Sequence, residues 1–391
     1  MDTQVAIIGA GPAGLLLAHL LQRAGIESMV LEARTREYVE HRVRAGVLEQ
    51  GTVDVLTETG VADRLHREGM VHRGLELRFG GRGHRIALSD LAGGRAITVY
   101  GQQEVVKDLI AARLEAGGEL RFEAEATAIE DLDGDRPVVR LASGEELGCA
   151  VVAGCDGFHG VSRAAAPDGA LAVYERVYPF AWLGILARAA PSSEELIYAH
   201  HDRGFALHSM RSPEITRLYL QVAPDDELEA WPDERIWEEL QTRMATRDGA
   251  FALNEGEIFE RGIAPMRSFV AEPMRHGRLF LAGDAAHIVP ATGAKGLNLA
   301  VADVRVLARA LRAFFERGDE AELDAYSDRC LRRVWRVQHF SWWMTQMLHR
   351  LDANDPFEGK LQRSQLEYVV RSEAAARTLA ENYVGLELED V

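Results

Sequence analysis

The sequence predicts an α/β fold in which a parallel-sheet domain is interrupted by an antiparallel-sheet domain and followed by a helical C-terminal region. Three observations indicate this order. A strand, a glycine turn, a helix and a second strand begin at residue 3; short alternating strands crowd residues 174–266; and an apolar strand at 278–283 precedes a long helical stretch. We therefore expect the first domain at 1–173, the sheet domain at 174–266, and the rest of the first domain with the helical region at 267–391.

Composition narrows the function classes. The 391 residues include 44 basic and 61 acidic side chains, a net charge of −17, which disfavours binding to nucleic acid or to an anionic membrane surface. The N-terminus lacks the pattern of a signal peptide, and no apolar run is long enough to span a bilayer. Three cysteines without metal-ligand spacing, Cys149, Cys155 and Cys330, predict a reducing cytoplasmic location and no metal site.

The first strand–turn–helix unit contains a glycine motif. Gln4–Ile8 has the composition of a buried parallel strand, and the helical stretch Leu15–Ala24 follows the turn Gly9-Ala10-Gly11-Pro12-Ala13-Gly14. In this G-x-G-x-x-G pattern the first glycine permits the turn, the second lets the backbone approach a pyrophosphate, and the third lets the helix pack on the strand. Glu32, 18 residues after Gly14 at the end of strand Met29–Glu32, is placed to bind ribose hydroxyls. The pattern predicts a Rossmann-like dinucleotide site and leaves NAD and FAD both open.

A second motif distinguishes the two cofactors. The apolar strand that begins at Arg278 ends in Gly283-Asp284, and a helix is expected from Gly293 to Arg312. A carboxylate at the C-terminal end of such a strand can accept hydrogen bonds from a polyol, and FAD has a ribitol where NAD has none. The alternative is that Asp284 only caps the turn. This motif favours FAD.

The middle strands present polar side chains on one face. Alternation places Leu207, Ser209 and Arg211 on one face of their strand, and Arg217, Tyr219 and Gln221 on one face of the next. Tyr198 shares a face with Leu196 and His200 on the preceding strand. A guanidinium with serine and tyrosine hydroxyls suits an aromatic carboxylate. The alternative is a solvent-exposed sheet face.

These motifs together carry a family resemblance. Gly9–Gly14, Gly154-Cys155-Asp156-Gly157 and Gly283-Asp284, with the segments 42–50, 340–344 and 381–386, resemble the single-component flavoprotein aromatic hydroxylases along the whole chain. The resemblance implies an FAD-dependent monooxygenase that converts 4-hydroxybenzoate to 3,4-dihydroxybenzoate with NAD(P)H and O2 through a flavin C4a-hydroperoxide. The rivals are a hydroxylase of another phenolic acid and a non-catalytic FAD-binding or redox-sensing protein.

The resemblance also assigns roles around the substrate. It implies that Tyr198, Tyr383 and His72 form a catalytic proton relay from the phenol, and that Arg217 gates flavin movement. Ala291 stands where the family usually has proline, and we expect its carbonyl to keep the contact with the phenol on a looser loop. The implied substrate-binding residues are Tyr198, Ser209, Met210, Arg211, Tyr219 and Ala291.

The remaining implied residues bind nucleotides. Those for FAD are Gly9, Gly11, Ala13, Gly14, Glu32, Arg42, Val43, Arg44, Ala45, Gly46, Val47, Gln102, Asp284, Leu297 and Asn298. Those for NAD(P)H are Arg34, Tyr38, Arg42, Arg44, His159 and Arg267, although the basic cluster is also consistent with a solvated turn neutralised by Glu37 and Glu40. Ala33 replaces an arginine usual in the family, so NADPH and NADH both stay open, with NADPH favoured. We expect a homodimer; the tryptophans Trp335, Trp342 and Trp343 suit either a core or a dimer face.

Overall fold

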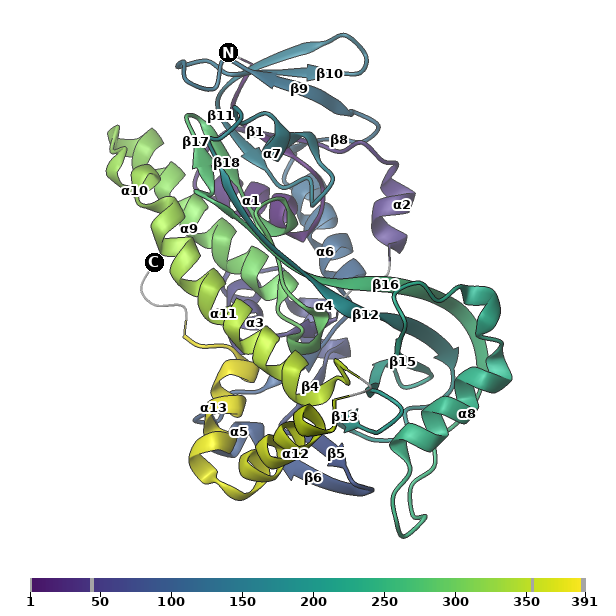
Figure 1. Cartoon of the computed structure of the whole chain (residues 1–391). Helices are drawn as coiled ribbons and strands as arrows, with labels where there is room; N and C mark the ends of the chain where they lie inside the picture. Colours follow the sequence, from purple (N-terminus) through teal and green to yellow (C-terminus); the bar gives the residue numbers. More distant parts are fainter. Residues whose placement is uncertain (1, 43–45, 353–354, 388–391) are drawn as a thin grey trace.

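The computed structural model describes residues 2–42, 46–352 and 355–387. Two large sheets form the body of the molecule, and a long two-stranded ribbon joins them (Figure 1). The ribbon consists of β12 (Ala172–Arg188) and β16 (Glu257–Glu272), two antiparallel strands of the second sheet that extend towards the first. The interrupted α/β architecture predicted from the sequence is confirmed by this arrangement and by its structural relatives, which are described below.

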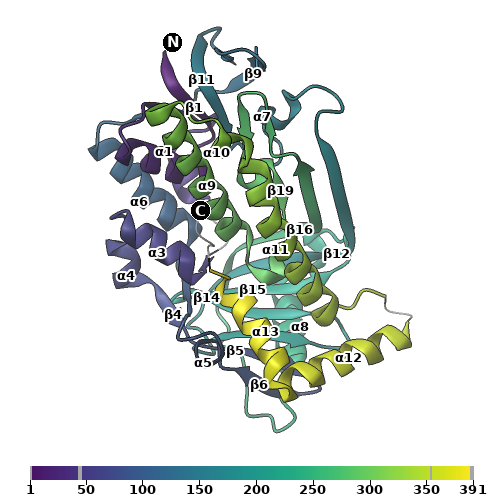
Figure 2. The same cartoon turned by 90° about the vertical axis from the view of Figure 1, so that its left-hand side faces the viewer.

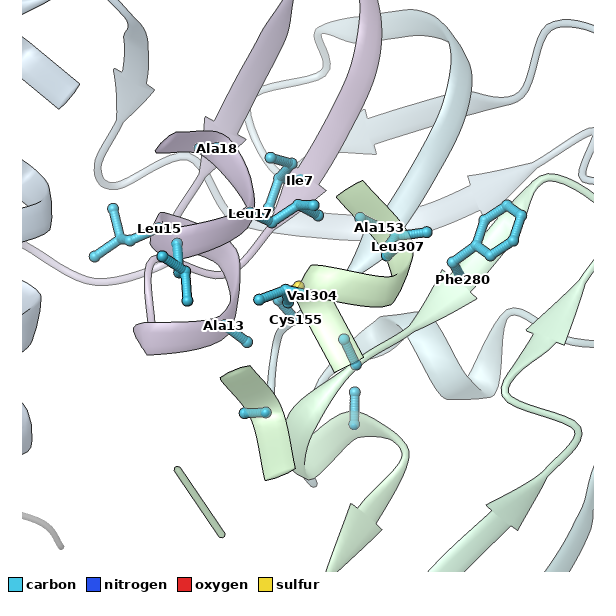
Figure 3. Packing of buried hydrophobic residues seen from close by; sticks show 14 of the residues in the cluster. Ile7, Ala13, Leu15, Leu17, Ala18, Ala153, Cys155, Phe280, Val304 and Leu307 are labelled. Atoms are coloured by element: carbon cyan, nitrogen blue, oxygen red, sulfur yellow. The ribbon is translucent and has the colours of Figure 1, made fainter. Parts of the chain in front are cut away.

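The first sheet is mainly parallel and has the order β17-β18-β11-β1-β2-β8. Its centre, β1, pairs parallel with both β2 and β11, and its strand residues are almost all buried because helices cover both faces. The side chains of Ile7, Leu17 and Leu307 meet between this sheet and the helices α1 and α9 (Figure 3). The bounds are β1 (Thr3–Ile8), α1 (Pro12–Arg23), β2 (Ser28–Leu31), β8 (Glu119–Arg121), β11 (Glu146–Gly154), β17 (Arg275–His276), β18 (Leu279–Leu281) and α9 (Gly296–Arg317), with β9 (Ala126–Glu130) and β10 (Val138–Leu141) at the side.

The second sheet has the order β19-β16-β12-β15-β14-β13-β5-β6. The three alternating strands expected here are present as β13 (Leu196–His200), β14 (Ala206–Ser212) and β15 (Ile215–Val222). The sheet is not purely antiparallel, because β5 (Leu75–Phe79) pairs parallel with β13. It also recruits β6 (Arg82–Ile86) and β19 (His287–Ile288) from outside residues 174–266, and helix α8 (Asp233–Met244) covers the apolar face of β15.

The C-terminal part is helical, as expected. Helix α9 begins later than predicted, because residues 291–293 form a short 3-10 turn, η3, that ends at Ala294 with a φ of +54°. Figure 2 shows α9 and α11 side by side, with α12 and α13 at the far end of α11. Trp335 is 42% exposed and contacts Tyr174 edge to face, whereas Trp342 and Trp343 are half-buried. The helices are α10 (Ala321–Asp324), α11 (Tyr326–Leu348), α12 (Pro356–Arg371) and α13 (Glu373–Val384).

The other elements complete the molecule. A three-stranded sheet consists of β3 (Val47–Leu48), β7 (Ile97–Val99) and β4 (Met70–His72). The remaining helices are α2 (Arg36–His41), α3 (Gln50–Glu58), α4 (Asp63–Glu68), α5 (Leu88–Leu91), α6 (Gln102–Glu115) and α7 (Val161–Ala164). Within the described ranges, no helix is both long and apolar enough to cross a membrane. The three cysteines are buried free thiols.

Candidate active site

The glycine turn leaves open space beside the N-terminus of α1. Gly9 has a φ of +103°, and a Cβ there would lie 2.4 Å from the carbonyl oxygen of Cys155. A Cβ on Gly14 would lie 2.0 Å from the carbonyl oxygen of Gly9, so both positions require glycine. Nothing lies within 4 Å of a Cβ placed on Gly11. That free space, at a helix end with unpaired N–H groups, suits an approaching pyrophosphate.

A cavity of about 1060 Å³ continues from this turn. Its size suits a dinucleotide, since ordinary ligand cavities measure roughly 300–1,000 Å³. One end contains Glu32, whose carboxylate accepts the N–H groups of Ala10 at 2.8 Å and Arg34 at 2.9 Å. The predicted cofactor residues that line it are Gly9, Gly11, Ala13, Glu32, Arg42, Gln102, Asp284 and Leu297.

Other predicted cofactor residues do not line this cavity or are not described. The side chain of Asn298 ties α9 to the segment before α3, because its oxygen accepts the N–H of Glu49 and its nitrogen donates to the carbonyl of Val47. Gly46 contacts the guanidinium of Arg211, which lies 3.3 Å from a Cβ built there. The predicted positions Val43, Arg44 and Ala45 lie outside the described residues.

Two tyrosine hydroxyls meet in the interior on the substrate side. The hydroxyl oxygens of Tyr198 on β13 and Tyr383 on α13 lie 2.5 Å apart, and Tyr198 also donates to the carbonyl of Thr292 at 3.1 Å. Each tyrosine is 1% exposed, and burial raises the pKa of both phenols well above the ordinary value. Both side chains therefore stay protonated near neutral pH and form a two-member hydrogen-bond chain.

Several predicted substrate residues share the sheet face of Tyr198. In the strand register, Tyr198 lies opposite Leu207, which lies opposite Tyr219, and Ser209 lies opposite Arg217. The register shifts after Met210, so Arg211 departs from the strict alternation expected for it. Burial lowers the pKa of Arg211. The charge interaction with Tyr219 and a hydrogen bond that Arg211 donates to the Tyr219 oxygen oppose this shift, which places these two side chains together.

Comparison with known proteins identifies the family. The family model for the FAD binding domain matches residues 2–341. The chain is 49% identical, over its whole length and 96% of the relative, to a p-hydroxybenzoate hydroxylase from Acinetobacter baylyi. It belongs to the FAD-dependent aromatic hydroxylase family. A rifampicin monooxygenase from Streptomyces venezuelae is 28% identical over 82% of this chain and 67% of its own length.

The solved structures show the fold of this hydroxylase-family chain. A p-nitrophenol 4-monooxygenase from Pseudomonas putida superposes with a TM-score of 0.82 at 21% identity, covering 99% of this chain and 100% of the other. A Diels–Alderase of pyrroindomycin biosynthesis superposes with a TM-score of 0.80 at 23% identity, covering 99% and 81%. Because a Diels–Alderase shares this fold, the fold alone does not indicate hydroxylation.

The predicted nicotinamide residues of this FAD-binding chain surround the outer part of the cavity. The guanidinium carbons of Arg34 and Arg42 each lie 5.7 Å from the ring of Tyr38. His159 and Arg267 both pack on Phe158, at 4.9 and 4.8 Å. All five predicted residues other than Arg44 line the cavity, and their role stays a prediction.

Sequence reasoning missed a buried charged cluster behind Tyr383. The ammonium of Lys295, 1% exposed, donates to the carboxylate of Glu49 at 2.7 Å and to the carbonyl of Tyr383 at 2.8 Å. Arg333 donates to the second oxygen of Glu49 at 3.0 Å. Burial lowers the pKa of Lys295, and Glu49 opposes that shift. The available signal was a single lysine immediately before the mostly apolar first turns of α9.

Two predicted positions are not joined directly to the tyrosine pair. His72 is buried on β4, and its Nδ1 has no partner; among the residues described, no hydrogen bond links it to Tyr383. Burial lowers the pKa of His72, with Glu195 opposing, so the imidazole is neutral at neutral pH. The carbonyl of Ala291 accepts the N–H of Ala294 at 2.9 Å, and its contact with a phenol stays a prediction.

Proposed function

We propose that this chain is an FAD-dependent monooxygenase that converts 4-hydroxybenzoate to 3,4-dihydroxybenzoate. The reaction consumes NAD(P)H, a proton and O2, and releases NAD(P)+ and water. The observation that carries the proposal is the buried Tyr198–Tyr383 hydroxyl pair beside the sheet face that bears Ser209 and Tyr219. Storage of FAD needs no such face, and the full-length relative named p-hydroxybenzoate hydroxylase supports the same substrate.

The chain's own residues would hold the substrate and remove its phenolic proton. Ser209, Arg211 and Tyr219 bind the carboxylate, since a guanidinium with two hydroxyls satisfies both of its oxygens. Tyr198 accepts the hydrogen bond of the substrate phenol and passes a proton to Tyr383 without ionising, because both tyrosine pKa values are raised. The neutral imidazole of His72 is the acceptor at the outer end, through water.

Loss of the phenolic proton makes the ring rich in electrons at the carbon next to the oxygen. When bound, FAD would supply the redox chemistry, namely acceptance of a hydride from NAD(P)H and activation of O2 for transfer of one oxygen atom to that carbon. The apolar rings of Phe205 and Phe340, which lie 6.1 and 6.5 Å from the rings of the tyrosine pair, keep water away from the reacting ring.

The proposal includes the nucleotide site, gating, assembly and location. Arg34, Tyr38, Arg42, His159 and Arg267 would bind NAD(P)H, with NADPH favoured. Arg217, whose guanidinium carbon lies 5.0 Å from the Tyr219 ring, would gate flavin movement, since a side chain on the substrate face can report that the substrate is bound. The protein would act as a homodimer in the cytoplasm, which size-exclusion chromatography with light scattering and cell fractionation would test.

A substrate panel tests the reaction. Purified protein loaded with FAD is mixed with NADPH or NADH and with 4-hydroxybenzoate, 3-hydroxybenzoate or benzoate, and both nucleotide oxidation and product are measured. We expect 3,4-dihydroxybenzoate in near-equal amount to the nucleotide consumed, and little stimulation by benzoate, which has no phenolic proton. Equal or better turnover of a different phenolic acid would replace the substrate, and no stimulation by any phenol would reject the reaction.

A further inference from the structure

Ala291 donates its backbone N–H to a side chain of the neighbouring sheet. The acceptor is the thioether sulfur of Met266, at 3.2 Å. Met266 lies on β16 and is 5% exposed. The next residue along the chain, Thr292, provides the carbonyl that accepts the hydroxyl of Tyr198. A contact at Ala291 therefore lies one residue from the group that orients the tyrosine pair.

The backbone at this position has the shape that a proline would take. Pro290 has φ −53° and ψ 135°, which is the conformation that a residue before proline favours. Ala291 begins the 3-10 turn η3, and 3-10 residues have φ near −60°, which is also the fixed value of proline. Alanine differs from proline here in two respects: its φ is free to vary, and it carries an N–H donor.

The rest of this turn has its own contacts. The hydroxyl of Thr292 lies 2.9 Å from that of Thr345, and the N–H of Ala294 donates to the carbonyl of Ala291. Lys295 is held by Glu49. Among the contacts of the described residues, Met266 supplies the side-chain acceptor for the backbone N–H at the start of the turn.

We propose that Met266 is a positioning residue for the substrate turn. Its sulfur takes the Ala291 N–H and thereby restrains the backbone that a proline ring would fix covalently. The restraint keeps the carbonyls of Ala291 and Thr292 in place against the substrate phenol and Tyr198. Met266 acts through the turn and touches no reacting atom. The inference rests on the proposed hydroxylation of a phenolic acid.

Four proteins test the proposal: the natural chain, Met266→Leu, Ala291→Pro and the double variant. Leucine keeps the buried apolar bulk but has no acceptor. In the natural background, Met266→Leu should lower the ratio of hydroxylated product to NAD(P)H consumed by about two- to tenfold, the range of one lost hydrogen bond. In the Ala291→Pro background, where no N–H exists, the same change should alter that ratio by less than about 1.5-fold.

Hydrogen–deuterium exchange of the peptide covering 286–296 gives a second readout that needs no turnover. Met266→Leu should speed exchange of this peptide in the FAD-loaded protein, and the added Met266→Leu should not do so in the Ala291→Pro background. The matched control is Met274→Leu, a buried methionine of the FAD-side core, which should change neither readout.

The outcomes separate the two proposals. Equal effects of Met266→Leu in both backgrounds, or no effect in the natural one, would overturn the positioning role. If the natural chain forms no hydroxylated product, the proposed function fails, whereas the exchange pattern still decides whether Met266 restrains the turn. A third outcome is that Met266→Leu speeds exchange in the natural background alone but leaves the ratio of product to NAD(P)H unchanged. The turn would then loosen without harm to the reaction, and the effect of Met266 on hydroxylation would be overturned.

Discussion

The FAD site and the phenol site are built from the sequence in different ways. At the FAD site, the six consecutive residues 9–14 bring together a strand end, a helix N-terminus and the open space at Gly11. At the phenol site, the hydroxyls of Tyr198 and Tyr383 lie 2.5 Å apart, although the two residues are 185 positions apart in the sequence. The first site is made mostly of backbone groups, and the second mostly of side chains. We therefore expect changes on the FAD side to abolish cofactor binding through steric conflict, and changes on the phenol side to alter the reaction while FAD binding persists.

The largest expected effect comes from Gly14→Ala, because loss of the cofactor would abolish the reaction altogether. Its Cβ would lie 2.0 Å from the carbonyl oxygen of Gly9, so strand and helix must separate. We expect FAD affinity to fall by more than about 100-fold, about 3 kcal/mol or more. The comparison variant is Gly11→Ala, whose Cβ meets nothing within 4 Å; its apo-protein should unfold at the natural temperature while it binds FAD more weakly. Flavin fluorescence titration and thermal unfolding measure both, and normal FAD binding by Gly14→Ala would break the comparison.

The next effect tests the phenol side. Tyr198→Phe and Tyr383→Phe each interrupt the proton chain, so we expect the hydroxylation rate to fall by about 10²- to 10⁴-fold, as for loss of an acid–base group. FAD affinity should stay within about twofold, because neither hydroxyl lines the FAD cavity. Tyr326→Phe is the matched control: this buried hydroxyl donates to the carbonyl of Leu281 on the FAD side, and its loss should lower stability without slowing proton removal. Rapid-mixing absorbance of the bound phenol distinguishes these results.

The two regions also differ in how far the sequence predicts them. The FAD turn, Glu32 and the order of β1, α1 and β2 follow from short-range patterns, since the function of each glycine depends on its neighbours. On the phenol side, strand alternation predicts which residues share a face, but only the family resemblance indicated Tyr383. The parallel pairing of β5 with β13 and the Lys295–Glu49 contact, 246 residues apart, depend on tertiary packing that no local pattern encodes.

The smallest expected effect is on the pH dependence of folding stability. Two buried histidines, one in each region, act on it in opposite directions. On the phenol side, burial lowers the pKa of His349 to about 3; this ring accepts the N–H of Trp182 and stacks on Phe180. On the FAD side, burial also disfavours the charge of His287, but Asp303 at 2.6 Å outweighs it and the pKa is raised. His349 therefore favours folding above its unfolded pKa of 6.5, and this stability is lost as pH falls towards 3. His287 contributes stability that is fully present below 6.5 and is lost as pH rises through its raised folded pKa.

Thermal unfolding across pH tests this opposition. At about pH 5 the neutral burial of His349 should cost about 2 kcal/mol relative to neutral pH, because the unfolded imidazole is protonated there and the folded one is not. His349→Gln should remove this cost, so the unfolding temperature should fall less between about pH 7 and pH 5. Part of the fall should remain, because burial also lowers the pKa of His208, to about 4. His287→Gln should instead steepen the acid fall, because it removes a charge that stabilises the folded state below pH 6.5. Absolute stability will differ among the variants, so the slope is the quantity compared. Parallel slopes for all three proteins would show that these histidines do not set the acid response of either region.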